Sequence, residues 1–405
     1  MATVVQKYGG SSLADADKIK RVAERIAASR QTGCQVVAVC SAMGDTTDDL
    51  IKLAHQITPR PDPREMDLLL STGEVVSSAL VAMALNSMGH QAVSLTGVQA
   101  GIQTTTLFGK AQITGIEPKR IRKELAEGKT VIVAGFQGFT EENDVTTLGR
   151  GASDLTAVAL AAALKADRCE IYTDVEGIYT ADPRVVPEAV KIPDISYEEM
   201  LELAMLGAKM QPRSIELAAI YEVPVLVAHS FKDSPGTLIH REAPMETRNK
   251  VRGVACDLNV GKITVLGVPD RPGIAAAIFE PLAQAGVSVD VIVQNASVEK
   301  LTDVSFTISR TDLPRAVELV RSIAHAIGAK GTTSSSGLAK VSIVGAGIQN
   351  APGYAARTFR ALADAGVNIE MITTSEIRIT CIVAEEKAKE AVRILHRAFG
   401  LESGS

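Results

Sequence analysis

The sequence has few aromatic residues and no strong excess of either charge. Phenylalanine, tyrosine and tryptophan together make up 3% of its 405 residues, and the formal net charge is −5. A nucleic-acid surface normally combines a positive patch with aromatic side chains on which bases stack. The composition therefore argues against nucleic acid as a partner and favours small metabolites.

The five cysteines, Cys34, Cys40, Cys169, Cys256 and Cys381, are scattered along the chain. Their number is odd and none belongs to a C-x-x-C pair, so neither a disulfide framework nor a zinc knuckle is expected. The sequence also lacks an apolar signal segment at its start and any run of about 18 apolar residues. We therefore expect a protein of the reducing cytoplasm with no membrane span.

The length allows two or three domains. Up to about residue 230, short apolar runs alternate with helical patterns. The predicted strands include Gln35–Cys40, Ala92–Leu95, Thr130–Ala134, Cys169–Thr173 and Val223–Val227, and the predicted helices include Ala14–Ser29, Glu74–Met88 and Asp154–Leu164. Near-continuous apolar strands between helices indicate an α/β fold with a mainly parallel sheet covered on both faces. Ligands of such a sheet bind beyond the carboxyl ends of its strands.

The stretch Val4–Ser12, VVQKYGGSS, runs from a predicted strand through two glycines towards a helix that is expected to begin at Leu13. Glycines allow positive φ and a close approach of backbone N–H groups to an anion, while the helix dipole and Lys7 add positive potential. The simplest ligand is a phosphate. Because Lys7 precedes Gly9 and Gly10, the motif is not a Walker A loop. Taken alone, it is also compatible with an ordinary strand-to-helix turn.

Four further polar segments with glycines lie at the ends of predicted strands or ahead of a predicted helix. They are CSAMGDTT from Cys40, VAGFQGF from Val133, TLGRGASDLTA from Thr147 and YTDVEGIYTADPR from Tyr172. Each alone is compatible with a capped turn. Together with Lys7 they place cations, hydroxyls and anion-binding amides at one edge of the sheet, which predicts a binding site there.

The last 140 or so residues contain an internal repeat. Pro272 aligns with Pro352 and Asp290 with Glu370, both at a spacing of 80 residues. Each copy has the βαββαβ order of a ferredoxin-like domain. A polar segment, residues 328–337, is predicted to join the copies as a flexible tether. The predicted organisation is a first domain at 1–240, a charged linker at 241–261, and repeats at 262–330 and 338–401.

The motifs VQKYGGSSL, VVAVCSAMGDTTD, TTLGRGASD, YTDVEGIYTADPR and TTSEIRI occur in this order, with Gly73-Glu74 among them. Over nearly the whole chain the sequence resembles the aspartate kinases of the amino-acid kinase family, followed by two ACT regulatory domains. The resemblance implies a three-layer αβα kinase domain. It also implies ATP-dependent phosphorylation of the L-aspartate side-chain carboxylate to 4-phospho-L-aspartate, the entry step to lysine, threonine, methionine and diaminopimelate synthesis.

An aspartate side chain, with a reference pKa near ~3.9, is already ionised at neutral pH, so the reaction needs no general base. It needs in-line positioning and neutralisation of phosphoryl charge. By resemblance, Lys7, Gly9, Gly10 and Asp154 form the catalytic group, and Ser41, Thr47, Glu74, Arg150 and Ser153 hold aspartate. The resemblance assigns the nucleotide to Lys7, Tyr8, Gly9, Gly10, Thr173, Asp174, Tyr179, Asp182, Arg184 and Lys209. Mg²⁺ is expected on the ATP phosphates without protein ligands.

The sequence departs from the family pattern at two places. Ala152 stands where a second glycine is usual and Leu155 where threonine is common, and an alanine there requires negative φ. Lys209 and Arg213 are one residue closer than in the usual pattern. If both lay on one helix, the missing residue would rotate the rest of that helix by about 100°.

A feedback amino acid, threonine or lysine or both, is expected where the ACT repeats pair, which also implies a homo-oligomer or an α2β2 assembly. Its ammonium needs an acceptor and its carboxylate needs backbone amides, and the turn after Asp270 offers both. The predicted regulatory residues are Asp270, Pro272, Gly273, Ile274, Ala275, Asp290, Gln294, Asn368, Ile369, Thr374 and Ser375. Because Asn350 replaces Asp270 in the second repeat, one repeat is expected to bind more tightly.

Two alternatives remain open at this point. The first is a kinase of the same fold for another small carboxylate or a carbamate, and the second is a catalytically silent amino-acid sensor. The presence of Lys7, Glu74, Arg150 and Asp154 together favours the aspartate-phosphorylating enzyme.

Overall fold

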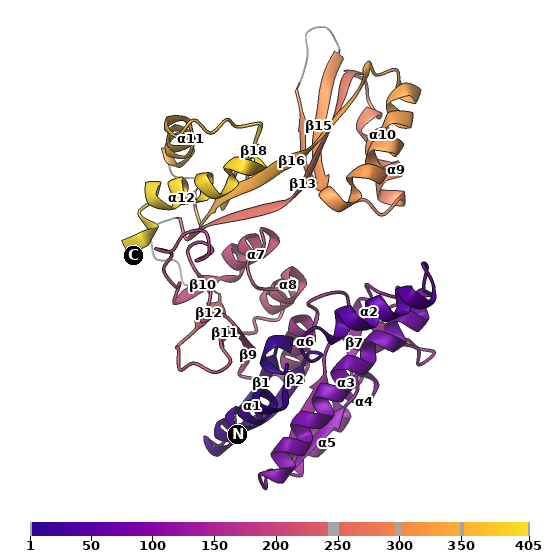
Figure 1. Cartoon of the computed structure of the whole chain (residues 1–405), viewed down its shortest axis with the longest axis vertical. Coiled ribbons are helices and arrows are strands. Elements are labelled where there is room, and N and C mark those ends of the chain that lie inside the picture. The colour runs from indigo at the N-terminus through magenta and orange to yellow at the C-terminus, as the bar shows by residue number, and fades with distance from the viewer. Residues whose placement is uncertain (1, 242–250, 296–300, 349–351, 404–405) are drawn as a thin grey trace. The chain divides into compact units, whose positions relative to one another are not determined.

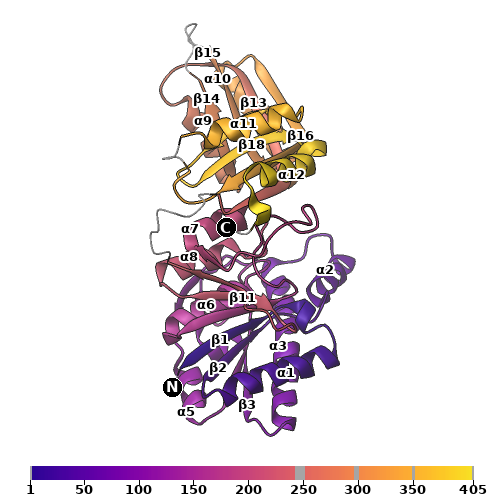
Figure 2. The same ribbon diagram turned by 90° about the vertical axis from the view of Figure 1, so that its left-hand side faces the viewer.

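The computed structural model describes residues 2–241, 251–295, 301–348 and 352–403. It divides into two compact units (Figures 1 and 2). The N-terminal unit comprises Met1–Tyr179 and Lys191–Thr247, and the C-terminal unit comprises Thr180–Val190 and Arg248–Ser405.

The N-terminal unit is built on an eight-stranded sheet of order β10-β12-β11-β9-β1-β2-β6-β3. Its strands are β1 (Thr3–Tyr8), β2 (Gln35–Cys40), β3 (Ala92–Leu95), β6 (Thr130–Ala134), β9 (Arg168–Thr173), β10 (Asp194–Ser196), β11 (Val225–His229) and β12 (Thr237–His240). All neighbours are parallel except β11 and β12. The predicted mainly parallel α/β sheet is confirmed.

Helices cover both faces of this sheet (Figure 2). The helices of the N-terminal unit are α1 (Ala16–Gln31), α2 (Thr46–Ile57), α3 (Pro63–Ser87), α4 (Gly97–Ala100), α5 (Lys119–Ala126), α6 (Ser153–Leu164), α7 (Tyr197–Met205) and α8 (Pro212–Ile220). Side chains of α1 and α3 form one core with Tyr8 of β1. Because successive side chains of a strand point to opposite faces, Lys7 lies on the other side, where α6 packs.

A second, four-stranded sheet of order β5-β4-β7-β8 was not predicted. Its strands are β4 (Ile102–Thr104), β5 (Ile113–Ile116), β7 (Gln137–Phe139) and β8 (Val145–Thr147). They have three or four residues each, too short for a clear periodic pattern. This sheet matters for the site because β8 leads directly into the segment that carries Arg150.

Among the described residues, α3 is the one helix long and apolar enough to cross a membrane, with a mean hydropathy of 1.8 in its most apolar window. Half of that window is buried inside the protein. Its buried residues include Asp67 and Glu74, whose side chains belong to the interior of the fold. We therefore interpret α3 as a core helix.

The C-terminal unit contains both repeats in one six-stranded sheet of order β14-β15-β13-β16-β18-β17 (Figure 1). Its strands are β13 (Gly253–Pro269), β14 (Val289–Gln294), β15 (Leu301–Ser309), β16 (Gly331–Val344), β17 (Met371–Thr374) and β18 (Arg378–Ala384). Its helices are α9 (Ile274–Gln284), α10 (Leu313–Ile327), α11 (Tyr354–Asp364) and α12 (Ala388–Ala398). The described residues also form four short 3-10 helices: Gly10–Ser12 in the first unit, and Arg310–Asp312, Glu385–Lys387 and Leu401–Ser403 in the second.

Two predicted connections are instead strands. Residues 253–261 of the predicted linker form the first half of β13, and most of the predicted tether is the first half of β16. Residues 253–257 pair with 340–344, whereas residues 262–266 pair with 331–335. The start of β13 therefore supplies a strand to the second repeat. A polar Thr/Ser run forms a strand here because its backbone pairs along β13, which overrides the composition. Residues 242–250 of the predicted linker lie outside the described residues.

The segment Thr180–Val190, predicted as part of the first domain, belongs to the C-terminal unit. Its Ala181 and Val186 are buried in the core of the second repeat. The Thr180 hydroxyl lies 2.8 Å from Nε2 of His396 on α12, and the Thr180 carbonyl accepts a hydrogen bond from the N–H of Val254. The boundary predicted from sequence misses this insertion because only contacts distant in sequence reveal it.

Candidate active site

Lys7 and Asp154 form an ion pair between β1 and the first turn of α6. Their Nζ and Oδ1 atoms are 2.7 Å apart, and the side chains are 12% and 11% exposed. In this partly desolvated place the pair is screened much less than a surface pair. The structure thus brings together two residues separated by most of the N-terminal unit, as the sequence predicted.

The glycine pair after Lys7 has a different role from the expected one. Gly9 has φ −73°, and neither glycine has positive φ. The N–H of Gly9 donates to the carbonyl of Tyr172 at 3.2 Å, so it is not free for an anion. At Gly10 an added Cβ would lie 2.8 Å from the carbonyl oxygen of Ala42, which explains the glycine by close packing.

The helix expected directly after the glycines also begins later. A 3-10 turn spans Gly10–Ser12, and α1 starts only at Ala16. The Asp15 carboxylate caps it by accepting a hydrogen bond from the N–H of Lys18. The capped end of α1 is therefore not the anion site, and the positive charge at this edge comes from Lys7.

Glu74 on α3 is 3% exposed and has an incomplete set of partners. Its Oε1 accepts a hydrogen bond from the N–H of Ala42 at 3.2 Å, but Oε2 is buried without a hydrogen-bond partner among the described residues. Burial raises the pKa of the Glu74 carboxyl to about 7. On the next turn Ser77 donates its hydroxyl to the carbonyl of Ser41 at 2.7 Å. Helix α3 is thus fixed against the segment after β2.

The loop before α6 presents Arg150 and Ser153. Gly149 and Gly151 have φ of 93° and 76°, whereas Ala152 has φ −76°. The alanine that replaces the family's glycine is therefore unstrained, as the requirement for negative φ demands. No side chain caps the N-terminus of α6, and its first-turn Ser153 is buried.

Arg150 is paired with Asp48, the last residue of the motif VVAVCSAMGDTTD, and no role was predicted for Asp48. Both residues are substantially exposed, at 75% and 45%. Thr47 precedes Asp48 in the first turn of α2, so Arg150 and Thr47 come from segments that meet at this edge. Gly135 packs closely against Ser153, since an added Cβ at Gly135 would lie 2.9 Å from the Ser153 hydroxyl.

Of the predicted nucleotide residues, Thr173, Asp174 and Lys209 lie together. The Thr173 hydroxyl donates to Asp174 at 3.0 Å, and the Lys209 ammonium pairs with the same carboxylate. The hydrogen bond from Lys209 holds the pKa of Asp174 below its usual range. Lys209 lies in the non-helical segment between α7 and α8. The rotation considered for its short spacing to Arg213 does not apply, because only Arg213 is in a helix.

The remaining nucleotide residues are Tyr179, Asp182 and Arg184. Tyr179 forms an isolated β-bridge with Lys191 in the N-terminal unit. Asp182 and Arg184 form an exposed ion pair at 2.8 Å within the segment that belongs to the C-terminal unit. Their nucleotide role stays a prediction.

The predicted regulatory residues lie at turns and strand ends of the C-terminal unit. Gly273 has φ 90° at the start of α9, and Asp270 is exposed. Asp290, at the start of β14, is paired with Lys340 of the other repeat. The hydroxyl of Ser375 is buried with no hydrogen-bond partner among the described residues. Pro272, Ile274, Ala275, Gln294, Asn368, Ile369 and Thr374 occupy the same turns and strand ends, while Asn350 lies outside the described residues.

A buried polar network beneath β1 was missed by sequence reasoning. Glu170 is 3% exposed and accepts hydrogen bonds from Gln6 at 2.8 Å, Tyr172 at 2.9 Å and Arg168 at 2.6 Å. The ring of Tyr172 stacks on Tyr8, with centroids 5.2 Å apart. The signal was a polar residue at an inward position of each of two buried strands. The network holds β1 against β9 next to Lys7, and it explains Tyr8 as a packing residue.

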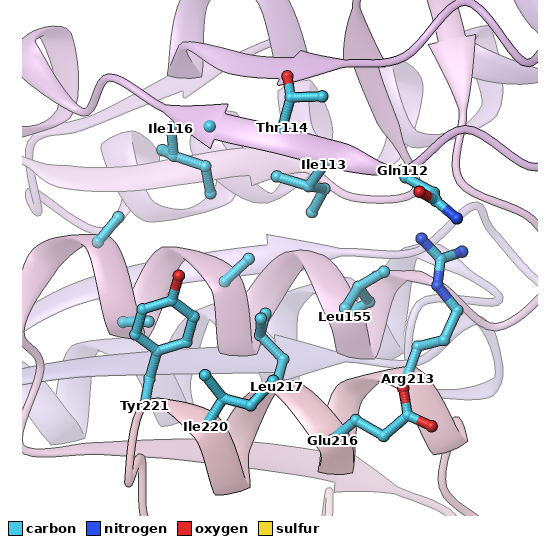
Figure 3. A pocket seen from close by; sticks show the side chains of 14 residues that line it. Gln112, Ile113, Thr114, Ile116, Leu155, Arg213, Glu216, Leu217, Ile220 and Tyr221 are labelled. Carbon is cyan, nitrogen blue, oxygen red and sulfur yellow. The ribbon is translucent and has the colours of Figure 1, made fainter.

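An apolar groove of about 440 Å³ lies between β5, α6 and α8. Figure 3 shows Ile113 and Ile116 on one wall, Leu155 and Leu217 opposite, and Arg213 at one end. None of the predicted catalytic, substrate or nucleotide residues lines it. Among the described residues no three His, Cys, Asp or Glu side chains gather to hold a metal ion.

Family models match both parts of the chain. The amino acid kinase family matches residues 2–229, and the ACT domain family matches residues 263–322 and 341–399. An aspartokinase of Mycolicibacterium smegmatis is 52% identical over 408 aligned positions, which cover 99% of this chain and 97% of the relative.

Solved structures give the same result. Aspartokinase III of E. coli in complex with aspartate and ADP has a TM-score of 0.80 at 28% identity, covering 98% of this chain and 99% of that one. The same E. coli enzyme in complex with lysine and aspartate has a TM-score of 0.73 at 28% identity, with the same coverage.

Proposed function

The chain belongs to the amino acid kinase family, as an aspartokinase followed by ACT domains, and on this premise we propose which of its residues perform each part of the reaction. The enzyme binds ATP and phosphorylates the side-chain carboxylate of L-aspartate to 4-phospho-L-aspartate, under allosteric control. The comparisons give no support to a kinase for another acid or to a silent sensor.

The assignment of the aspartate site rests on the carboxylate of Glu74, one oxygen of which has no hydrogen-bond partner among the described residues. A buried carboxylate oxygen without a hydrogen bond raises the free energy of the folded protein, and a cation that binds to it offsets this penalty. The α-ammonium of an amino acid is such a cation. Glu74 therefore binds the ammonium of aspartate, and its Oε1 is already oriented by the N–H of Ala42.

Arg150 binds the α-carboxylate of aspartate through the two parallel N–H groups of its guanidinium. In the structure the guanidinium is paired with Asp48. Because this pair is exposed, a substrate carboxylate displaces Asp48 at little cost. Ser41, Thr47 and Ser153 lie on the neighbouring segments and supply hydroxyl donors.

Lys7 neutralises charge on the transferring phosphoryl group. Its ammonium is held in place by Asp154, and a cation fixed in advance costs no reorganisation during the reaction. The ionised side chain of aspartate attacks without a general base. A Mg²⁺ ion held by the nucleotide phosphates would add further charge neutralisation.

Thr173, Asp174 and Lys209 hold the nucleotide in this proposal, with Tyr179, Asp182 and Arg184 as further candidates. Lysine or threonine, or both, bind to the ACT repeats through the predicted regulatory residues, of which Asp270 and Asp290 accept the ligand ammonium. The E. coli complex with lysine supports this class of effector. We also propose a homo-oligomer or an α2β2 assembly in the cytoplasm, where the five unpaired cysteines fit a reducing compartment.

An assay of acyl-phosphate formation with hydroxylamine, run beside ADP release, tests the activity. Aspartate, glutamate and N-acetylglutamate are offered in turn with Mg-ATP. We expect turnover with aspartate alone. Absence of turnover with aspartate, or a preference for another acid, would refute the proposed chemistry.

A further inference from the structure

Asp67 on α3 is a buried carboxylate that none of the roles above uses. Its side chain is 1% exposed. It accepts hydrogen bonds from the N–H of Gly109 at 3.1 and 2.9 Å, from the N–H of Thr147 at 2.8 Å and from the Thr147 hydroxyl at 2.7 Å. A buried charge held by several donors fixes their positions, because losing them would leave the charge unpaired.

The position of Asp67 in the chain connects two parts of the aspartate site. Asp67 precedes Glu74 by seven residues, so both side chains emerge on the same buried side of α3. Thr147 is the last residue of β8, and Arg150 follows it by three residues. One carboxylate therefore joins the helix that carries Glu74 to the strand that leads to Arg150.

Arg213 on α8 also holds the segments that Asp67 contacts. Its guanidinium donates to the carbonyl of Leu148 at 2.8 Å and to the carbonyl of Ala111 at 3.1 Å, and Figure 3 shows it reaching out of α8 beside Gln112. Asp67 accepts hydrogen bonds from N–H groups of the segments 109–111 and 147–148, and Arg213 donates hydrogen bonds to carbonyl groups of the same two segments. The N–H of Ala111 also donates to the carbonyl of Thr147 at 2.9 Å. The residues directly before the loop that carries Arg150 are thus fixed by a brace of hydrogen bonds from both α3 and α8.

We propose that Asp67 is a positioning residue for the amino-acid substrate. It sets the spacing between Glu74 and Arg150, and it contacts neither the substrate nor the nucleotide. This role rests on the proposed function, which assigns the α-ammonium to Glu74 and the α-carboxylate to Arg150. Loosening the brace should weaken aspartate binding and leave the nucleotide site, built on β1 and β9, unaffected.

Steady-state kinetics of Asp67→Asn in the full chain test this role. An amide offers one oxygen acceptor and turns an N–H₂ group towards donors, so the four bonds cannot all form. We expect the KM for aspartate to rise about tenfold or more, with the KM for ATP changed by less than about twofold. Asp62→Asn is the matched control on the same helix, because Asp62 accepts two backbone N–H groups as N-cap but none from the braced segments. Because Asn caps a helix about as well as Asp, this control should leave thermal stability and both KM values nearly unchanged.

Thr147 supplies a second test that does not alter the buried charge. Thr147→Val removes the hydroxyl donor and should raise the aspartate KM, whereas Thr147→Ser keeps the donor and should restore it. If Asp67→Asn fails to fold, this pair decides the question. An equal rise of both KM values, or no change in folded variants, would overturn the positioning role while wild-type turnover of aspartate leaves the proposed function intact. Wild-type inactivity towards aspartate would refute the proposed function itself.

Discussion

Lys7, Asp154 and Glu74 of the N-terminal unit are more deeply buried than the candidate regulatory carboxylates of the C-terminal unit. In the N-terminal unit Lys7 and Asp154 are about one-tenth exposed and Glu74 is 3% exposed. In the C-terminal unit Asp270 is exposed and Asp290 is 38% exposed in its pair with Lys340. Charges act more strongly where water is excluded, so the first arrangement suits stabilisation of a transition state. The second suits a ligand that must bind and leave as its concentration changes.

Among the variants considered, Lys7→Ala is expected to have the largest effect on activity. The change removes a buried, fixed cation that is matched to charge in the transition state and also leaves Asp154 unpaired. We expect kcat to fall by about 10² to 10⁴ with a modest change in the KM for ATP. Circular dichroism of the variant controls for folding. Near wild-type turnover in a folded variant would contradict the phosphate role of Lys7.

Glu74→Gln should separate function from stability. The amide keeps the shape but loses the charge that the ammonium needs, so the KM for aspartate should rise about 10- to 100-fold. Since burial raises the pKa of Glu74 from the ordinary value of 4.5 to about 7 in the folded chain, stability is lost as the pH rises from about 4.5 to about 7, and the loss remains in full above pH 7. The variant should therefore unfold at a higher temperature than the wild type at pH 8, and a matched melt at pH 4 should show a smaller gain. A lower unfolding temperature at pH 8 would show that Glu74 is already satisfied without substrate.

The pH dependence of aspartate use should follow the same carboxyl. Below about pH 7 Glu74 takes up a proton in the free enzyme and loses its attraction for the ammonium, so kcat/KM for aspartate should fall about tenfold per pH unit. Burial raises the pKa of the neighbouring Cys40 to about 12, so that thiol does not titrate in this range. The acid limb should be absent from Glu74→Gln. An unchanged limb in that variant would assign it to another group.

The same contrast between buried and exposed groups explains what sequence could predict. The strands 35–40, 92–95 and 130–134 were predicted with the bounds that the structure shows, because each is a short, mostly apolar run between helical patterns. The grouping of Lys7 with Asp154 followed from the resemblance to the aspartate kinases, whose motifs include both residues. In contrast, Asp67 and Glu170 are polar residues among apolar ones, and only their distant partners reveal their roles.

The errors in the C-terminal unit have the same origin. The first half of β13 was interpreted as a linker because polar residues interrupt its apolar ones. The first half of β16 was interpreted as a tether because a strand of Ser, Thr and Gly has no apolar signature. Its pairing with a strand some 80 residues away decides its structure. In the N-terminal unit, the glycine pair after Lys7 was interpreted as an anion-binding turn because glycine allows positive φ, whereas close contact with the Ala42 carbonyl explains the residue type at Gly10.

The smallest expected effect concerns the exposed unit and its two reciprocal ion pairs. Lys340 of the second repeat pairs with Asp290 of the first, and Lys262 of the first repeat pairs with Glu370 of the second at 3.0 Å. If Asp290 accepts the ammonium of the feedback amino acid, Lys340 competes with that ligand. The Asp290 side of the pair is 38% exposed, and such partly exposed ion pairs are worth at most about 1 kcal/mol, so Lys340→Ala should lower the concentration of lysine or threonine for half-inhibition by up to about fivefold. Lys262→Ala is the matched control and should change it less, because the second repeat lacks the equivalent of Asp270. Inhibition that weakens in Lys340→Ala, or responds equally to both changes, would place the effector away from Asp290.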